Sequence, residues 1–191
     1  EAMSAHTEFA LGSVGKWHLG GGNTGPRDTG GWPYFAGSLG SGVEDYSNWQ
    51  KIITIGDEPP QSIVSSTYAT KDTTNDAISW IQDQADQPWF CWVAYNAAHS
   101  PFHDPPSTIS GKENPFAGAR GNRNRFEAML WAMDSEIGRL IDTIDRSTTE
   151  IILIGDNGTP GGVIQPPFTR EHSKGTLYDG GTHVPLVING P

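Results

Sequence analysis

Residues 126–155, FEAMLWAMDSEIGRLIDTIDRSTTEIILIG, contain a long helix pattern followed directly by a strand pattern. Apolar residues recur at steps of three and four, which predicts an amphipathic helix that runs to about Arg146. The run Ile151–Ile154 is continuously apolar and ends at a glycine, as expected for a strand that is buried on both faces. An amphipathic helix next to a buried strand is typical of an α/β protein.

The same alternation continues on both sides of this stretch. Residues 9–14 and 89–95 predict two more buried strands, and residues 72–85, which begin with polar capping residues, predict a second amphipathic helix. A further apolar strand pattern occupies residues 184–188, whereas residues 20–50 show no period and are expected to form a long ordered loop. Strands that alternate with helices indicate an α/β fold with a mainly parallel sheet flanked by helices.

Length and composition limit the possible classes of protein. A chain of 191 residues fits one domain or part of one. Its 24 Gly and 14 Pro follow no repeat period, which excludes a collagen-like chain. The net charge of -10 argues against binding of nucleic acid or of an anionic membrane surface, because no basic stripe could replace counterions.

Membrane insertion and disulfide bonding are not expected. No apolar run approaches the roughly 20 residues of a bilayer span, and Glu1–Ser4 lacks the basic and apolar regions of a signal peptide. The single cysteine, Cys91, excludes an internal disulfide and is expected to be a packing residue.

Polar clusters follow three of the predicted strands. Lys16 and His18 come after the first strand, His99 after the strand at 89–95, and Asp156 and Asn157 after the strand at 151–154. In open α/β sheets, ligands bind beyond the carboxyl ends of the strands. We therefore expect these side chains to form one functional site.

Four segments, in order, carry a resemblance to a known family. They are 15–20 (GKWHLG), 94–102 (AYNAAHSPF), 155–158 (GDNG) and 174–185 (KGTLYDGGTHVP). Together they resemble the motifs of the sulfatase family, within the alkaline phosphatase superfamily. The resemblance spans nearly the whole chain and implies that residues 1–191 are a partial sulfatase catalytic domain, incomplete at both ends.

The resemblance implies a role for each polar residue. A sulfate ester repels nucleophiles, so its hydrolysis requires cations directed at the sulfate oxygens, and Lys16 and Lys174 resemble the lysines that contact sulfate. His99 resembles the general acid that protonates the leaving alcohol, and His18 the histidine that interacts with the nucleophile. His103, His172 and His183 are expected to be loop histidines without a catalytic role.

The family's metal ion, usually Ca²⁺, is held by oxygen ligands, and Asp156 and Asn157 resemble its C-terminal pair of ligands. The family nucleophile is a formylglycine made from Cys or Ser in a Cys/Ser-x-Pro/Ala-x-Arg motif, which does not occur here. The Asp-Asp pair that supplies the other metal ligands is absent too. We therefore expect this chain alone to be inactive.

A sheet without its leading strands would expose an edge and an apolar face. This predicts poor solubility, self-association, or a companion chain that supplies the missing part of the domain. The resemblance implies that the parent enzyme acts on a sulfated small molecule or glycan and is periplasmic or secreted.

Two other functions fit the same residues. One is hydrolysis of a phosphonate or phosphodiester by an enzyme of the same superfamily. The other is noncatalytic binding of a sulfated glycan, with Trp32, Tyr34, Trp49 and Trp89 available to stack on sugar rings. A domain in which the motifs are remnants without function is a third possibility.

Overall fold

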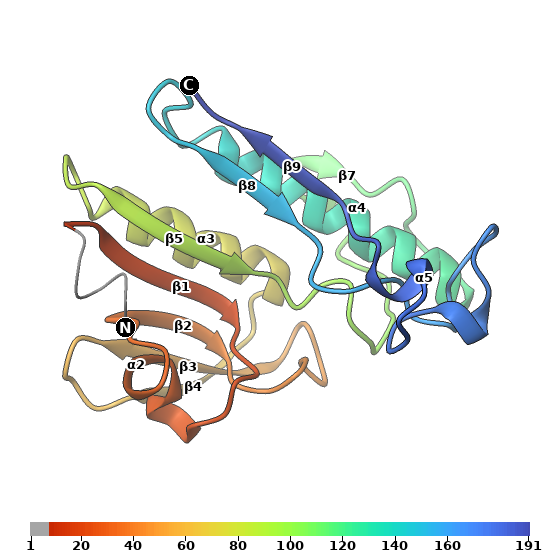
Figure 1. Ribbon diagram of the computed structural model, residues 1–191, viewed down its shortest axis with the longest axis horizontal. Helices are drawn as coiled ribbons and strands as arrows, with labels where there is room; N and C mark the ends of the chain where they lie inside the picture. Colours follow the sequence, from red (N-terminus) through yellow and green to blue (C-terminus); the bar gives the residue numbers. More distant parts are fainter. Residues whose placement is uncertain (1–7) are drawn as a thin grey trace.

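The computed structural model describes residues 8–191, so Glu1–Ser4, where no signal peptide was expected, lies outside the described residues. The fold is α/β, with a five-stranded sheet in the order β4-β3-β2-β1-β5 and helices beside it (Figure 1). The strands are β1 (Ala10–Lys16), β2 (Tyr34–Ser38), β3 (Trp49–Ile55), β4 (Gln61–Ser65) and β5 (Trp89–Ala94).

The sheet has a parallel part and an antiparallel part. Strand β1 pairs in parallel with β2 on one side and with β5 on the other, whereas β3 and β4 are antiparallel additions beyond β2. Gly15 pairs with Ala94 and has a φ of 93°, and a Cβ there would lie 2.0 Å from the Ala94 carbonyl oxygen. Only glycine allows this close approach of the two strands. The predicted α/β class is confirmed.

Helix α3 (Ala69–Gln82) packs on β1 and β5, and its Ala77 is buried against Val14 and Ala36. The helix begins before residue 72, where a polar cap was predicted. Asp72 does not cap it but is buried beside Lys51, 3.0 Å from the ammonium nitrogen. Asp72 of α3 and Lys51 of β3 thus form a buried ion pair, and Asp72 does not act as the expected cap.

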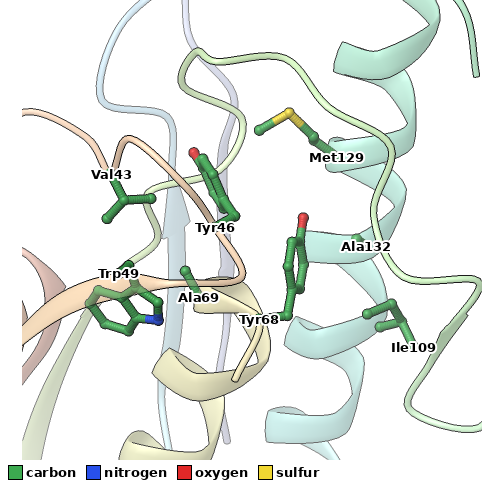
Figure 2. Packing of buried hydrophobic residues seen from close by; sticks show 8 residues of the cluster. All are labelled: Val43, Tyr46, Trp49, Tyr68, Ala69, Ile109, Met129 and Ala132. Atoms are coloured by element: carbon green, nitrogen blue, oxygen red, sulfur yellow. The ribbon is translucent and has the colours of Figure 1, made fainter. Parts of the chain in front are cut away.

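Helix α4 (Gly121–Ile141) confirms the predicted long amphipathic helix, although it begins earlier and ends before Arg146. Its buried Met129 and Ala132 pack with Tyr46 and Tyr68 in a cluster that Figure 2 shows from close by. This cluster joins α4 to the segments before β3 and before α3. It therefore supports the loops at the carboxyl ends of the parallel strands.

The prediction of one long loop over residues 20–50 is wrong. That segment contains β2 and two short helices, η1 (Gly22–Thr24) and α2 (Gly25–Asp28). Strand β2 has only five residues and lies between glycine-rich turns, so it gives no clear period. Its pairing with β1 and β3 determines its conformation.

Contrary to the prediction, strands β8 (Ile151–Ile154) and β9 (Leu186–Asn189) do not join the main sheet. They form a separate antiparallel pair, and their apolar side chains are exposed rather than buried. Strand β5 is also less buried than predicted, since Trp92 is 48% exposed. Each of these strands has one edge without a partner among the described residues, and this missing neighbour accounts for the exposure.

The remaining elements are short. Strands β6 (Thr108–Ile109) and β7 (Lys112–Glu113) form a small hairpin, and η2 (Arg170–His172) and α5 (Asp179–Thr182) precede β9. Among residues 8–191, none of the helices combines the length and apolar character that a bilayer span requires.

Candidate active site

Lys16 is the last residue of β1. The residues after it fix its position at the carboxyl end of this strand. The buried Trp17 donates from its ring nitrogen to the Gly20 carbonyl at 2.8 Å and packs edge-on against Phe35. His18 is exposed and has a φ of 54°, in the left-handed region that non-glycine residues rarely adopt. Such strain is found preferentially at functional sites. Trp17 thus anchors the backbone between the two candidate side chains.

The loop that carries His99 is fixed by buried hydrogen bonds. The Asn96 amide donates to the Ser38 hydroxyl at 2.9 Å, which links the carboxyl ends of β5 and β2. The Tyr46 hydroxyl lies 2.8 Å from the Asn96 carbonyl and 2.9 Å from the His99 carbonyl, and donates to both. Burial raises the pKa of Tyr46, so its hydroxyl stays protonated as a donor.

The His99 ring lies against Gly42. A Cβ at that position would be 2.8 Å from the His99 Nδ1 atom, which lies 2.9 Å from the Ser100 carbonyl oxygen. A proton on Nδ1 would be donated to this carbonyl, leaving Nε2 for exchange with a substrate. Gly42 therefore gives the ring its space.

Asp156 follows β8 and lies next to Lys16. The Lys16 ammonium nitrogen is 3.6 Å from Oδ2 of Asp156, and the two side chains are 19% and 72% exposed. This contact places the carboxyl end of β8 beside that of β1, although their strands belong to different sheets. Two of the three polar clusters therefore meet as the sequence predicted.

Lys174 is tied to the same loop through the backbone. Its N–H donates to the Thr159 carbonyl at 3.0 Å, and the Gly158 N–H donates to the Gly181 carbonyl at 2.9 Å. A Cβ at Gly158 would lie 2.0 Å from the Gly180 carbonyl oxygen, so the two segments pack backbone to backbone. The Asp156–Asn157 loop and the Lys174 segment thus form one unit.

The structure therefore brings Lys16 into contact with Asp156 and holds Lys174 beside the Asp156–Asn157 loop. His18 and His99 follow the adjacent parallel strands β1 and β5, at the same edge of the sheet. The catalytic roles of these residues stay predictions.

A calcium ion would find suitable ligand types here but too few of them. Asp156 and Asn157 offer the oxygen atoms that Ca²⁺ prefers, and the Asp156 carboxylate is open to solvent. Residues 8–191 hold no group of three or more His, Cys, Asp or Glu side chains that could bind a metal. Because Ca²⁺ takes six to eight oxygen ligands, these two residues would have to be complemented by others.

The histidines and the cysteine that were expected to have no catalytic role make packing contacts. His103 is packed against Tyr46 and bonded to the Tyr68 hydroxyl at 3.0 Å, and burial lowers its pKa. His172 stacks on Tyr178. Burial raises the pKa of Cys91 to about 12, so its thiol stays protonated near neutral pH, consistent with a packing residue.

The aromatic residues considered for sugar stacking are engaged inside the fold. Trp49 is only 2% exposed, Trp32 stacks on Phe90, and Tyr34 stacks on Trp80. Burial excludes Trp49 from sugar stacking, whereas Trp32 and Tyr34 are half-buried and each packs against a neighbouring ring. Sequence reasoning also missed Gly42, Ser38 and Tyr46 as supports of the His99 loop. Their contacts span 50 or more positions in the chain, so only the fold reveals them.

Lys16 thus contacts Asp156, Lys174 lies on the neighbouring loop, and His18 and His99 follow the parallel strands β1 and β5. Comparison with known proteins identifies the family: the family model described as Sulfatase matches residues 7–191. The chain belongs to the sulfatase family, whose members are hydrolases of sulfate esters.

Individual relatives agree with this assignment. The chain is 26% identical to an uncharacterized sulfatase, YdeN, of Escherichia coli strain K12, over 96% of this chain and 31% of that protein. It is 31% identical to arylsulfatase J of Mus musculus over 92% of this chain and 32% of that protein. The chain thus spans about a third of the length of these curated relatives.

Solved structures share the fold. A crystal structure of Ps i-CgsB in complex with k-i-k-neocarrahexaose superposes with a TM-score of 0.76 at 21% identity, covering 96% of this chain and 45% of that one. A structure of BT4656 with D-glucosamine-2-N,6-O-disulfate gives a TM-score of 0.67 at 16% identity, covering 96% and 53%.

Proposed function

We propose that this chain forms the sulfate-binding and proton-transferring part of a sulfate ester hydrolase. The observation that carries the proposal is the contact between Lys16 and Asp156. It joins two strand ends that bear motifs of the family, in a protein whose family model covers nearly the whole chain. Sulfated sugars are the proposed substrates, since BT4656 was solved with a disulfated glucosamine.

Lys16 and Lys174 supply positive charge to the sulfate group. Negative charge shifts toward the sulfate and leaving oxygens as the ester bond breaks, and preorganised cations stabilise that charge in the transition state. Lys16 is suited to this because its aliphatic part is largely buried while its ammonium group reaches the open Asp156 carboxylate. Lys174 approaches from the neighbouring loop.

His99 and His18 move protons. His99, held by its carbonyl contact with Tyr46 and its ring contact with Ser100, donates a proton to the leaving alcohol oxygen. His18 accepts the proton of the attacking group. Asp156 and Asn157 would supply two of the oxygen ligands of a calcium ion, which would polarise the sulfate group when bound.

We further propose that the formylglycine nucleophile and the remaining metal ligands come from sequence outside residues 1–191. Support comes from the length of the relatives, of which this chain covers about a third, and from the two ligands that Asp156 and Asn157 can offer. The 191-residue chain by itself is then expected to turn over no sulfate ester.

The test is an assay of the protein translated from its complete reading frame. We expect sulfate release from an aryl sulfate and from a sulfated monosaccharide, and a loss of kcat/KM of about 100-fold or more for Lys174→Ala, the size expected when one oxyanion donor is removed. His183→Ala, an exposed loop histidine, is the matched control and should change the rate by less than about threefold.

Faster cleavage of a phosphodiester or phosphonate than of every sulfate ester would assign the site to the related hydrolase chemistry instead. Calcium-dependent binding of sulfated sugar without turnover would assign it to glycan binding. Either result would overturn the proposed sulfatase activity.

A further inference from the structure

His103 lies in the same loop as His99, and both nitrogens of its ring are engaged. Its Nδ1 atom lies 2.9 Å from the Pro101 carbonyl oxygen, and its Nε2 atom lies 3.0 Å from the Tyr68 hydroxyl. The ring also packs against that of Tyr46, with the two ring centroids 4.4 Å apart. His103 is thus fixed at three points, although the proposed function gives it no role.

These contacts select one form of the imidazole ring. A carbonyl oxygen only accepts hydrogen bonds, so Nδ1 of His103 carries the proton that is donated to the Pro101 carbonyl. In a neutral imidazole the other nitrogen is then an acceptor, so the Tyr68 hydroxyl donates to Nε2. The hydrogen bonds therefore run in one direction, from Tyr68 through His103 to Pro101.

The surroundings favour this neutral form. Burial is the largest effect, and it lowers the pKa of His103. Smaller effects come from the Pro101 carbonyl, Asp45 and Asp104, which raise the pKa, and from Arg125, which lowers it. The two tyrosines packed on the ring stay protonated and uncharged, because burial raises their own pKa values. The ring therefore faces no ionised tyrosine that would hold a second proton on it.

The carbonyl that His103 holds is next to the carbonyl that orients His99. The Nδ1 atom of His99 lies 2.9 Å from the Ser100 carbonyl oxygen, and the following carbonyl is that of Pro101. The proline ring fixes φ, one of the two backbone dihedrals between these carbonyls, so a rotation of one is transmitted to the other. Releasing the Pro101 carbonyl would therefore also release the partner of the His99 ring.

We propose that neutral His103 is a positioning residue for His99. By holding the Pro101 carbonyl, it fixes the preceding carbonyl and thereby the ring that donates to it. The inference rests on the proposed function, in which His99 protonates the leaving alcohol. A general acid that is misplaced by about 1 Å can lose on the order of 100-fold in rate. His103 acts only through His99.

NMR of the protein from the complete reading frame, with histidine labelled by nitrogen-15, tests the positioning without an assay of activity. At a pH where the rings are neutral, the shifts of His99 and His103 should each show one tautomer, with the proton on Nδ1. His103→Phe keeps a ring against Tyr46 but loses both hydrogen bonds, so the His99 shifts should move toward the average of two exchanging tautomers. His103→Asn, whose side-chain amide can still donate to the Pro101 carbonyl, should restore the wild-type shifts.

Three NMR results would overturn the proposal. They are unchanged His99 shifts in His103→Phe, a proton on Nε2 of His103 in the wild type, and a His103→Asn variant that shifts His99 as far as His103→Phe does. Should His103→Phe fail to fold, Tyr68→Phe takes its place, because it removes only the hydroxyl that donates to Nε2. It should move the His99 shifts in the same direction by a smaller amount, and unchanged shifts would again count against the proposal.

The leaving group of the ester provides the functional readout. His103→Phe should lower kcat/KM about tenfold or more for an alkyl sulfate and less than about threefold for an activated aryl sulfate, whose leaving group needs no proton. His103→Asn should recover most of the loss. His183→Phe, the same substitution at an exposed loop histidine, is the matched control and should change either rate by less than about threefold.

Equal losses on the two esters in His103→Phe would overturn the positioning role while leaving the sulfatase activity in place. A wild-type protein that cleaves no sulfate ester would instead overturn the proposed function. In that case the NMR shifts of the three proteins still decide whether His103 orients His99.

Discussion

Two of the most apolar strands of this chain, β8 and β9, are largely exposed. Strand β8 reads IILI and β9 reads LVIN, yet both are exposed along their length, while β1 reads ALGSVGK and is almost completely buried. The difference comes from neighbours: β1 has a strand on each side and helix α3 on one face, whereas β8 has one neighbouring strand within residues 8–191. Apolar sequence thus indicates how much burial a strand requires, and the neighbours decide how much it receives.

The largest expected effect is on the free energy of unfolding, and it distinguishes the buried main sheet from the exposed β8–β9 pair. Phe35 in β2 is fully buried, so Phe35→Ala should lower the free energy of unfolding of the 191-residue chain by about 4 kcal/mol. The exposed Ile152 in β8 should lose less than about 0.5 kcal/mol on replacement by Ala. Urea unfolding followed by circular dichroism measures both. Equal losses would show that β8 is already packed in this chain.

The next prediction concerns the contribution of a buried ion pair to stability. Lys51 is 5% exposed, and its ammonium nitrogen lies 3.0 Å from Asp72 and 2.6 Å from Asp76. Lys51→Met should cost about 3 kcal/mol, because it leaves two carboxylates in the interior without a counterion. Lys112→Met, at an exposed position in β7, is the matched control. Urea unfolding that shows the same stability for both variants would contradict this account.

The same cluster should make stability depend on pH. Burial raises the pKa of Asp76 from 3.8 to about 6, despite the opposing effect of Lys51. Between these values the folded state binds more protons than the unfolded state, so this group's contribution to stability is present below about pH 4 and lost as the pH rises to about 6.

At about 1.4 kcal/mol for each unit of pKa shift, the stability difference between wild type and Asp76→Asn should change by roughly 2 kcal/mol across that window. Unfolding curves at several pH values measure it. A difference that does not vary with pH between 4 and 6 would rule out the raised pKa.

Only a small effect on stability is expected at the candidate site. Since the Asp156 side chain is 72% exposed, its contact with Lys16 is screened by water, and Asp156→Ala should change the free energy of unfolding by less than about 1 kcal/mol. Adding salt should reduce even this difference. A larger loss would mean that Asp156 supports the fold rather than the chemistry.

Much of the fold could be predicted from local patterns. The period of residues 126–146 gave α4 and the apolar run at 89–95 gave β5, because both patterns arise within one element. Strand β2 was missed because its five residues depend on β1 and β3 for their conformation. The separate β8–β9 pair could not be foreseen either, since the sequence shows an apolar strand but not which neighbour it lacks.

In the candidate site, too, local sequence patterns predicted some features, whereas contacts between distant segments could not be predicted. Lys16 and Asp156 could be placed together from the rule that ligands gather at strand ends, and the structure joins them. The supports of His99 could not be found in this way. Tyr46 reaches the His99 carbonyl, and Gly42 makes room for the ring, only because β2 and β5 end at the same edge of the sheet.

The measurement that tests the central claim most directly is the leaving-group dependence of His99→Ala in the protein from the complete reading frame, with His183→Ala as control. If His99 protonates the leaving alcohol, kcat/KM should fall about 100-fold or more for an alkyl sulfate but much less for an activated aryl sulfate, whose leaving group needs no proton. Equal losses on the two esters would contradict the role of this strand edge in sulfate ester hydrolysis.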